Sequence, residues 1–178
     1  EWIFRIDADE ELTPELAEEL ERKIPLLGDN VNGIVLRRRI YFMGKWIKHG
    51  GIYPTLILRI FRTGKGHCEM TSMDEHLVLD EGDEIVFSKD LIDKNTKSLE
   101  WWTGKHNWYS GKECNDYLTH KLSLCEGNVK PKLFGDATER KRWLKYMAYY
   151  KTPLMIRAKW YYFYRYYLRL GFLDGKEG

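Results

Sequence analysis

Two aspartates, Asp7 and Asp9, directly follow the apolar run at residues 2–6, and this short segment constrains the fold more than any other part of the chain. Side chains alternate along a strand, so two acids separated by one residue point to the same side of its end. Carboxylate oxygens are the ligands that a hard divalent cation such as Mg²⁺ prefers. The segment therefore predicts a strand that ends in a metal-binding turn, with an ordinary solvated acidic turn as the alternative.

A helix is predicted immediately after this turn. Thr13 is a favourable N-cap residue, Pro14 suits the first helical position, and the apolar residues that follow recur at helical spacing. A strand, an acidic turn and a helix in this order favour an α/β domain. Because the strand begins at residue 2, we expect the chain to be a fragment of a larger domain.

Further strands are predicted after this helix, at residues 34–42, 56–62 and 85–88. The loop between the first two of them is rich in glycine, basic and aromatic residues. A long helical pattern then runs from about residue 98 to residue 122. These elements extend the predicted α/β domain through the first two thirds of the chain.

The last part of the chain is predicted to be helical. A linker at residues 127–136 is followed by two helices that are split at Pro153. We therefore expect two regions, residues 1–126 and residues 127–178.

The first 129 residues and the block that follows them carry opposite net charges. Residues 1–129 contain 17 Lys and Arg against 23 Asp and Glu, a net charge of −6, whereas residues 130–170 contain 11 against 2, a net charge of +9. The basic block also holds many aromatic residues and no run of the ~18–20 apolar residues that a membrane span needs. This composition favours helices that lie on an anionic membrane surface. Binding to single-stranded nucleic acid, or plain packing of the helices on their own domain, are the alternatives.

The three cysteines, at positions 68, 114 and 125, lack the spacing of a metal site and are odd in number. A reducing compartment fits this usage best. We therefore expect a cytoplasmic protein, bound peripherally to the inner face of the cytoplasmic membrane.

Five motifs, taken in order, resemble the family 2 glycosyltransferases. The motifs are WIFRIDADEELTPEL at residues 2–16, GKWI at 44–47, DEH at 74–76, KHNWY at 105–109 and GFLDG at 171–175. The resemblance is strongest to the branch that builds lipopolysaccharide core and exopolysaccharide in bacteria, and it covers nearly the whole chain. It implies a GT-A fold, Rossmann-like, of which this chain is the C-terminal part, followed by amphipathic basic and aromatic helices. The nucleotide-binding half would precede residue 1.

The resemblance also implies the reaction. A sugar would pass from a nucleotide-sugar donor to a lipopolysaccharide, exopolysaccharide or lipid-linked acceptor, with inversion. Asp7 and Asp9 would bind the divalent ion, Mg²⁺ or Mn²⁺, that stabilises the departing diphosphate. Asp93 would be a further metal ligand or an ordinary acid at a strand end. Asp74 or Glu75 would be the catalytic base that takes the proton of the acceptor hydroxyl; a charged turn is the alternative.

Several other residues are candidates for substrate binding. They are basic or aromatic and lie in the predicted strands, the glycine-containing loop, the acidic motif and the long helix: Trp46, His49, Arg59, Arg62, His76, Lys105 and His106. For each of them, packing or solvation is the competing interpretation. Glu10 and Glu11 are interpreted as acids that favour the start of the helix.

A protein of a different class is the main alternative to an enzyme. The chain would then be a non-catalytic carbohydrate-binding or membrane-surface module on the same scaffold. A nucleic-acid-binding domain is a third and weaker alternative, because no motif for nucleic-acid recognition accompanies the basic block, and we expect no nucleic-acid partner. If the chain is part of a glycosyltransferase, we expect that the isolated chain does not turn over a nucleotide-sugar donor.

Overall fold

The computed structural model describes residues 1–69, 76–121, 133–134, 140, 143–144, 147 and 151–178. The chain divides into two compact units. The first consists of Glu1–Glu69, Glu75–Leu99 and Arg165–Gly178, and the second of Met70–Asp74 and Glu100–Tyr164. The predicted functional division between residues 126 and 127 stays a prediction.

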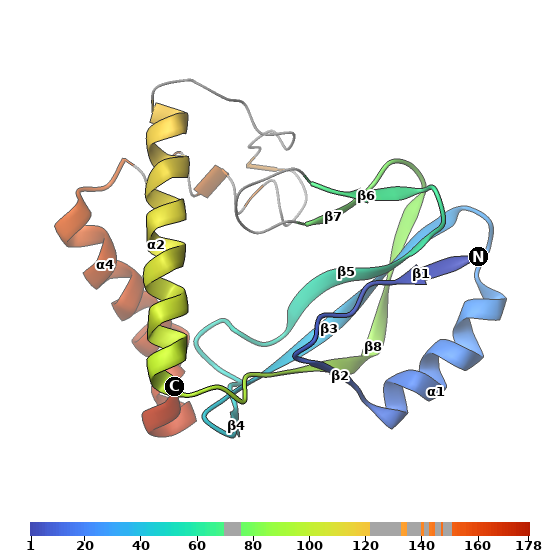
Figure 1. Ribbon diagram of the computed structural model, residues 1–178, viewed down its shortest axis with the longest axis horizontal. Helices are drawn as coiled ribbons and strands as arrows, with labels where there is room; N and C mark the ends of the chain where they lie inside the picture. Colours follow the sequence, from blue (N-terminus) through green and yellow to red (C-terminus); the bar gives the residue numbers. More distant parts are fainter. Residues whose placement is uncertain (70–75, 122–132, 135–139, 141–142, 145–146, 148–150) are drawn as a thin grey trace. The chain divides into compact units, whose positions relative to one another are not determined.

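A curled mixed sheet is the centre of the first unit (Figure 1). The strands run in the order β1-β5-β3-β8-β2, and β4 pairs with the end of β3. Strands β3 and β8 are parallel, and the other pairs are antiparallel. The sheet strands are β1 (Trp2–Phe4), β2 (Glu10–Leu12), β3 (Val31–Phe42), β4 (Lys45–Trp46), β5 (Thr55–Arg62) and β8 (Asp83–Lys94). A separate two-stranded sheet pairs β6 (Gly66–Cys68) with β7 (Leu77–Leu79).

Helix α1 (Pro14–Lys23) covers one face of this sheet. Its start is as predicted, since the Thr13 hydroxyl accepts a hydrogen bond from the backbone N–H of Leu16 at 3.2 Å. The helix is followed by the short 3₁₀ helix η1 (Ile24–Leu26). Burial of apolar surface between α1 and the sheet forms the core, which comprises Leu16, Leu20, Ile34, Leu36, Ile60, Phe87 and Leu91.

One carboxylate of α1 joins the helix to the sheet. Glu19, 3% exposed, accepts hydrogen bonds from the backbone N–H and the hydroxyl of Ser88 and from the backbone N–H of Lys89. Burial raises the pKa of Glu19, but the hydrogen bonds from Lys23, Lys89 and Ser88 outweigh it and lower the pKa to about 2. The N–H groups of β8 at this point are thus satisfied by a side chain.

The low pKa of Glu19 predicts acid sensitivity. A depressed folded-state pKa stabilises the protein above the unfolded value of 4.5, and this contribution is lost as the pH falls toward about 2. The shift corresponds to about 3 kcal/mol. We expect the wild type to lose about 3 kcal/mol more unfolding free energy between pH 6 and pH 2 than the Glu19→Gln variant, measured by urea unfolding. Parallel losses in the two proteins would contradict this role of Glu19.

Helices make up the described part of the second unit and the end of the chain. They are α2 (Leu99–Lys121), α4 (Leu154–Phe163), the π-helix η3 (Tyr164–Leu168) and the 3₁₀ helix η4 (Gly171–Glu177). Among the helices that the structure describes, none combines the length and the apolar composition that a membrane crossing requires.

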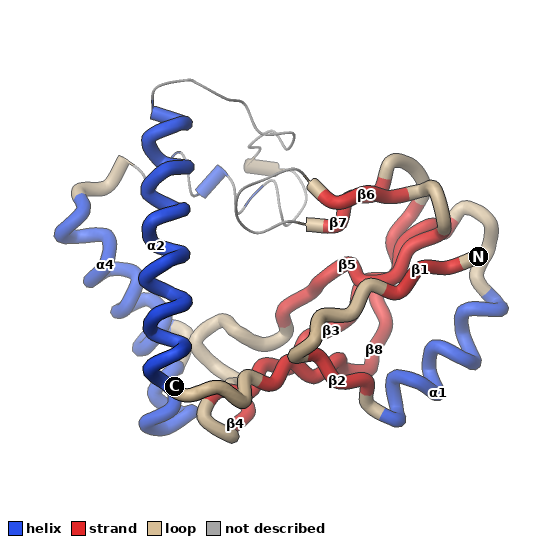
Figure 2. The backbone as a smooth tube through the Cα atoms, in the orientation of Figure 1, coloured by secondary structure: helices blue, strands red, loops and turns tan. Residues whose placement is uncertain are grey.

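The predicted α/β class is confirmed, as Figure 2 shows by colour. The predicted strands at 34–42 and 56–62 and the helix from 98 to 122 are found with small shifts of their ends. The predicted strand at 85–88 is only the middle of β8. Strand β2 occupies Glu10–Leu12, so Glu10 and Glu11 belong to the sheet and their interpretation as helix-start charges was wrong.

Candidate functional site

The turn between β1 and β2 carries Asp7 and Asp9. It is closed by the backbone N–H of Glu10, which donates to the carbonyl oxygen of Asp7 at 3.0 Å, and by the N–H of Asp7, which donates to Oε2 of Glu10 at 3.0 Å. Asp9 is exposed, whereas Asp7 is half-buried. The turn therefore presents the carboxylate of Asp9 to solvent.

A buried arginine holds the turn to the sheet. Arg59 of β5 is 4% exposed and forms ion pairs with Asp7 and, at 2.5 Å, with Oε1 of the buried Glu10. Burial lowers the pKa of Arg59, but hydrogen bonding and charge attraction to Glu10 and then Asp7 raise it by more. The guanidinium is therefore a fixed positive charge directly behind the Asp7–Asp9 turn.

Asp93 lies beside the same turn. It is the register partner of Glu10 in the β2–β8 pair, and the N–H of Lys94 donates to the carbonyl oxygen of Asp9 at 2.9 Å. Its carboxylate lies 3.4 Å from the guanidinium of Arg38. The fold thus brings Asp93 beside the Asp7–Asp9 turn, although more than 80 residues separate them in the sequence.

The described residues hold no group of three or more His, Cys, Asp or Glu arranged around a common ion position. Asp7 and Asp93 each face an arginine, and Asp9 is the exposed carboxylate. Mg²⁺ is commonly held by one or two carboxylates together with substrate phosphates. The exposed carboxylate of Asp9 is compatible with a site of that kind, whereas Arg38 and Arg59 are already paired with Asp93, Asp7 and Glu10.

The other arginines of β3 are engaged with a second buried acid. Asp90 of β8 accepts hydrogen bonds from Arg39 at 2.7 Å and from the hydroxyl of Tyr53 at 3.0 Å, and Arg37 donates to the same hydroxyl at 2.6 Å. Burial, followed by the hydrogen bond to Asp90, raises the pKa of Tyr53. This network neutralises much of the charge that the sequence places on residues 37–39.

Trp46 lies against this network. Its ring is 5.1 Å from that of Tyr53 in an edge-on arrangement, and the charged groups of Arg39 and Lys48 lie over it at 4.3 and 4.4 Å. These contacts are cation–π interactions. Two cations therefore already occupy positions over the ring that was predicted to contact a sugar.

His49 lies in the predicted glycine-containing loop and pairs with an acid from the end of the chain. Its Nδ1 is 2.8 Å from Oδ1 of Asp174 in η4. Burial raises the pKa of Asp174, but its hydrogen bonds with His49 and Lys48 lower the pKa by more. His49 thus belongs to a structured site that the loop and the C-terminal segment form together.

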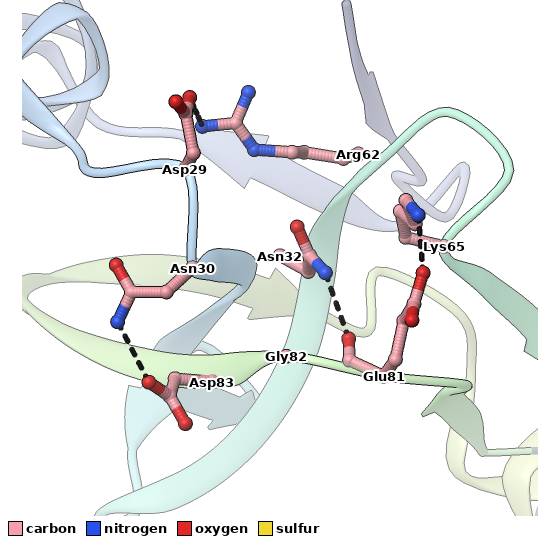
Figure 3. Close-up of a pocket in the computed structure, with 8 residues that line it drawn as sticks. All are labelled: Asp29, Asn30, Asn32, Arg62, Lys65, Glu81, Gly82 and Asp83. Carbon is pink, nitrogen blue, oxygen red and sulfur yellow. Dashed lines mark hydrogen bonds and ion pairs between the residues drawn. The ribbon is translucent and has the colours of Figure 1, made fainter.

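Arg62 takes part in a different surface feature. It donates to the carbonyl oxygens of Val31 at 2.9 Å and Gly28 at 3.2 Å, and it lines a surface cavity of about 460 Å³ (Figure 3). The cavity includes none of the other predicted site residues. It is lined by Asp29, Asn30, Asn32, Arg62, Lys65, Glu81, Gly82 and Asp83.

The remaining candidates are distributed over both units. His76 is exposed just before β7. On α2 of the second unit, His106 stacks on Trp102 with ring centroids 3.7 Å apart, and Lys105 lies over the rings of Trp101 and Tyr109. Asp74 and Glu75, the predicted base, lie outside the described residues.

No protein-family model matches this chain, and no solved structure matches it.

Three site residues were missed by reasoning from the sequence. Glu10 was assigned to a helix start, and Asp90 and Asp174 were given no role. For Glu10, no local signal was present, since it directly follows Asp9 and its partner Arg59 lies 49 residues away. Asp174 was noticed only as part of the GFLDG motif, and its partner lies 125 residues away.

Proposed function

We propose that this chain supplies the metal-binding and acceptor-side elements of a GT-A glycosyltransferase that transfers a sugar from a nucleotide-sugar donor to a glycolipid or polysaccharide acceptor. The observation that carries the proposal is the Asp7–Asp9 turn, which the buried Arg59 holds to the sheet and which lies beside Asp93. The order of motifs that resembles family 2 glycosyltransferases supports the same conclusion.

The chemistry of sugar transfer calls for carboxylates such as those at this turn. A bound divalent cation would neutralise the diphosphate leaving group. Asp9 would hold the cation, with Asp7 and Asp93 adjacent to it, while Arg59 keeps Asp7 and the turn in place. The base, Asp74 or Glu75, would accept the proton of the acceptor hydroxyl as its oxygen attacks the anomeric carbon and the diphosphate departs with the bonding electrons.

A test is binding of nucleotide sugars to the intact protein. Isothermal titration with the diphosphate sugars of uridine, guanosine and thymidine, each with Mn²⁺ and with EDTA, separates the proposal from its main alternative. An enzyme of this class binds one of these donors only with Mn²⁺. A non-catalytic carbohydrate-binding module binds sugars without regard to the metal, and that result would contradict the proposal.

Contact with a membrane surface is a second part of the proposal, and it rests on α4. The helix exposes most of its large apolar side chains, Met155, Ile156, Trp160, Tyr161, Tyr162 and Phe163, next to the exposed Lys159. Aromatic rings settle at headgroup depth, and basic side chains are attracted to anionic lipid. We propose that the region around residues 139–172 docks on the inner face of the cytoplasmic membrane.

Removal of one of these charges tests the docking. A basic residue near an anionic surface contributes about 1 kcal/mol, so Lys159→Gln is expected to weaken binding to anionic vesicles roughly fivefold. Co-sedimentation at low and high salt measures this, with Lys65→Gln of the first unit as the matched control. Equal binding to neutral and anionic vesicles, or equal effects of the two variants, would contradict docking through α4 and the region around it.

A further inference from the structure

A buried carboxylate connects the end of the chain to the loop that follows β4. Asp174 is 3% exposed, and its Oδ2 accepts hydrogen bonds from the backbone N–H of Lys48 at 3.0 Å and of His49 at 2.7 Å. Its Oδ1 lies 2.8 Å from Nδ1 of the same histidine. Both carboxylate oxygens are therefore committed to His49 and its neighbour.

This arrangement determines which nitrogen of the neutral imidazole ring carries the proton. An ionised carboxylate only accepts hydrogen bonds, so Nδ1 of His49 carries the hydrogen and donates it. In the neutral ring Nε2 is then an acceptor with a free lone pair. Nε2 has no partner among the described residues and is not among their buried unpartnered atoms. The fold thus holds an acceptor nitrogen in one orientation and leaves it open to solvent.

Cationic side chains surround the same loop. The N–H of Gly50 donates to the carbonyl oxygen of Arg169 at 2.9 Å, and Nε of Arg165 donates to the carbonyl oxygen of Gly50 at 2.8 Å. Gly51 has a φ of +74°, and a Cβ there would lie 3.1 Å from Nε of Arg169. Glycine at this position therefore allows the guanidinium of Arg169 to lie directly against the loop, so that two guanidinium groups and the carboxylate of Asp174 lie near His49.

We propose that Nε2 of His49 accepts a hydrogen bond from a hydroxyl group of an acceptor sugar that carries a negative charge, and that Asp174 is the positioning residue for this imidazole. The inference rests on the proposed function for the identity of the sugar as acceptor. The tautomer and the orientation of His49 rest on the geometry alone. The segment from Arg165 to Asp174 is then part of the acceptor site as well as a structural end of the chain.

Two variants separate binding from structure. In His49→Asn the side-chain amide can still donate to Asp174, as Nδ1 does, but nothing replaces Nε2. In Asp174→Asn the acceptor for Nδ1 loses its charge and the ring loses its orienting partner. We expect His49→Asn to keep the melting temperature of the wild type, and Asp174→Asn to lower it.

The experiment is nitrogen-15 NMR of the imidazole rings in the full chain, titrated with glucuronate, glucose and inorganic phosphate. The wild-type spectrum of the neutral ring should show the His49 proton on Nδ1 and not on Nε2, and glucuronate should shift the Nε2 resonance saturably and more strongly than glucose or phosphate. In His49→Asn, we expect glucuronate affinity, followed through backbone amides, to fall roughly two- to tenfold, the worth of one hydrogen bond.

The possible results are distinct. In the neutral ring of the wild type, a proton on Nε2 instead of Nδ1 would overturn the role of Asp174, whatever the function of the protein. A correct tautomer with no response of His49 to glucuronate would overturn the sugar site. A response to phosphate equal to that for glucuronate would show a site for anions alone and would also overturn it. None of these results depends on metal or donor binding, so the proposed function can fail or hold separately.

Discussion

Replacement of Arg59 with methionine is expected to lower the free energy of unfolding by about 3–5 kcal/mol, because it leaves a buried acid without its partner. The acid is Glu10, whose side chain is 1% exposed and whose Oε1 lies 2.5 Å from the guanidinium. Asp7, the second partner of Arg59, has a side chain that is 43% exposed, so solvent screens its attraction to the guanidinium. The loss should therefore come almost entirely from the Arg59–Glu10 pair, and urea unfolding at neutral pH measures it.

A double variant shows whether the buried charge is the cause. If it is, Glu10→Gln combined with Arg59→Met should recover most of the loss, since no isolated charge then remains. Arg62→Met on the same strand is the matched control: Arg62 is more exposed and its nearest acid, Asp29, lies 4.0 Å away. We expect Arg62→Met to lower the free energy of unfolding by on the order of 1 kcal/mol. A double variant as unstable as Arg59→Met alone would contradict this account of Arg59.

Local signals explain what the sequence could predict. Thr13 and Pro14 define the start of α1 through contacts within one turn, and the helix is found there. The apolar runs of β3 and β5 correctly predicted these two strands, because both strands contribute side chains to the core. The sequence named Asp7, Asp9 and Asp93 as candidate metal ligands without placing them together. The register of β2 and β8 places Asp93 beside the Asp7–Asp9 turn, and the role of the three acids as metal ligands stays a prediction.

Contacts between distant residues explain what was missed. The predicted strand stopped at Ser88 because polar residues follow it, yet β8 continues through Asp90, whose carboxylate is satisfied by Arg39 and Tyr53. Glu10 extends the sheet for a similar reason, since Arg59 neutralises it. Pairs of this kind join residues 37 to 51 positions apart, so no local pattern in the sequence reveals them.

Replacement of Asp9 with asparagine is expected to have the largest effect on binding. The variant removes one negative charge from the turn but keeps its size, and Asp9 is exposed, so the fold should be unchanged. Even residues that only support a metal ligand are worth roughly 10–100-fold in metal affinity. Loss of the ligand itself should therefore weaken Mn²⁺ binding by at least about 100-fold. Glu11→Gln is the matched control, because Glu11 is exposed two residues away and its nearest cation is Lys94, at 3.8 Å.

Electron paramagnetic resonance of Mn²⁺ with pyrophosphate tests the central claim most directly. The spectrum of free Mn²⁺ falls as the ion is bound, so the bound fraction is read in the wild type, Asp9→Asn and Glu11→Gln with and without pyrophosphate. Spectra of Mn²⁺ and pyrophosphate without protein correct for the complex that the two form alone. The account predicts that wild type and Glu11→Gln bind the ion with pyrophosphate present, and that Asp9→Asn does not. Binding by Asp9→Asn equal to that of the wild type would contradict it.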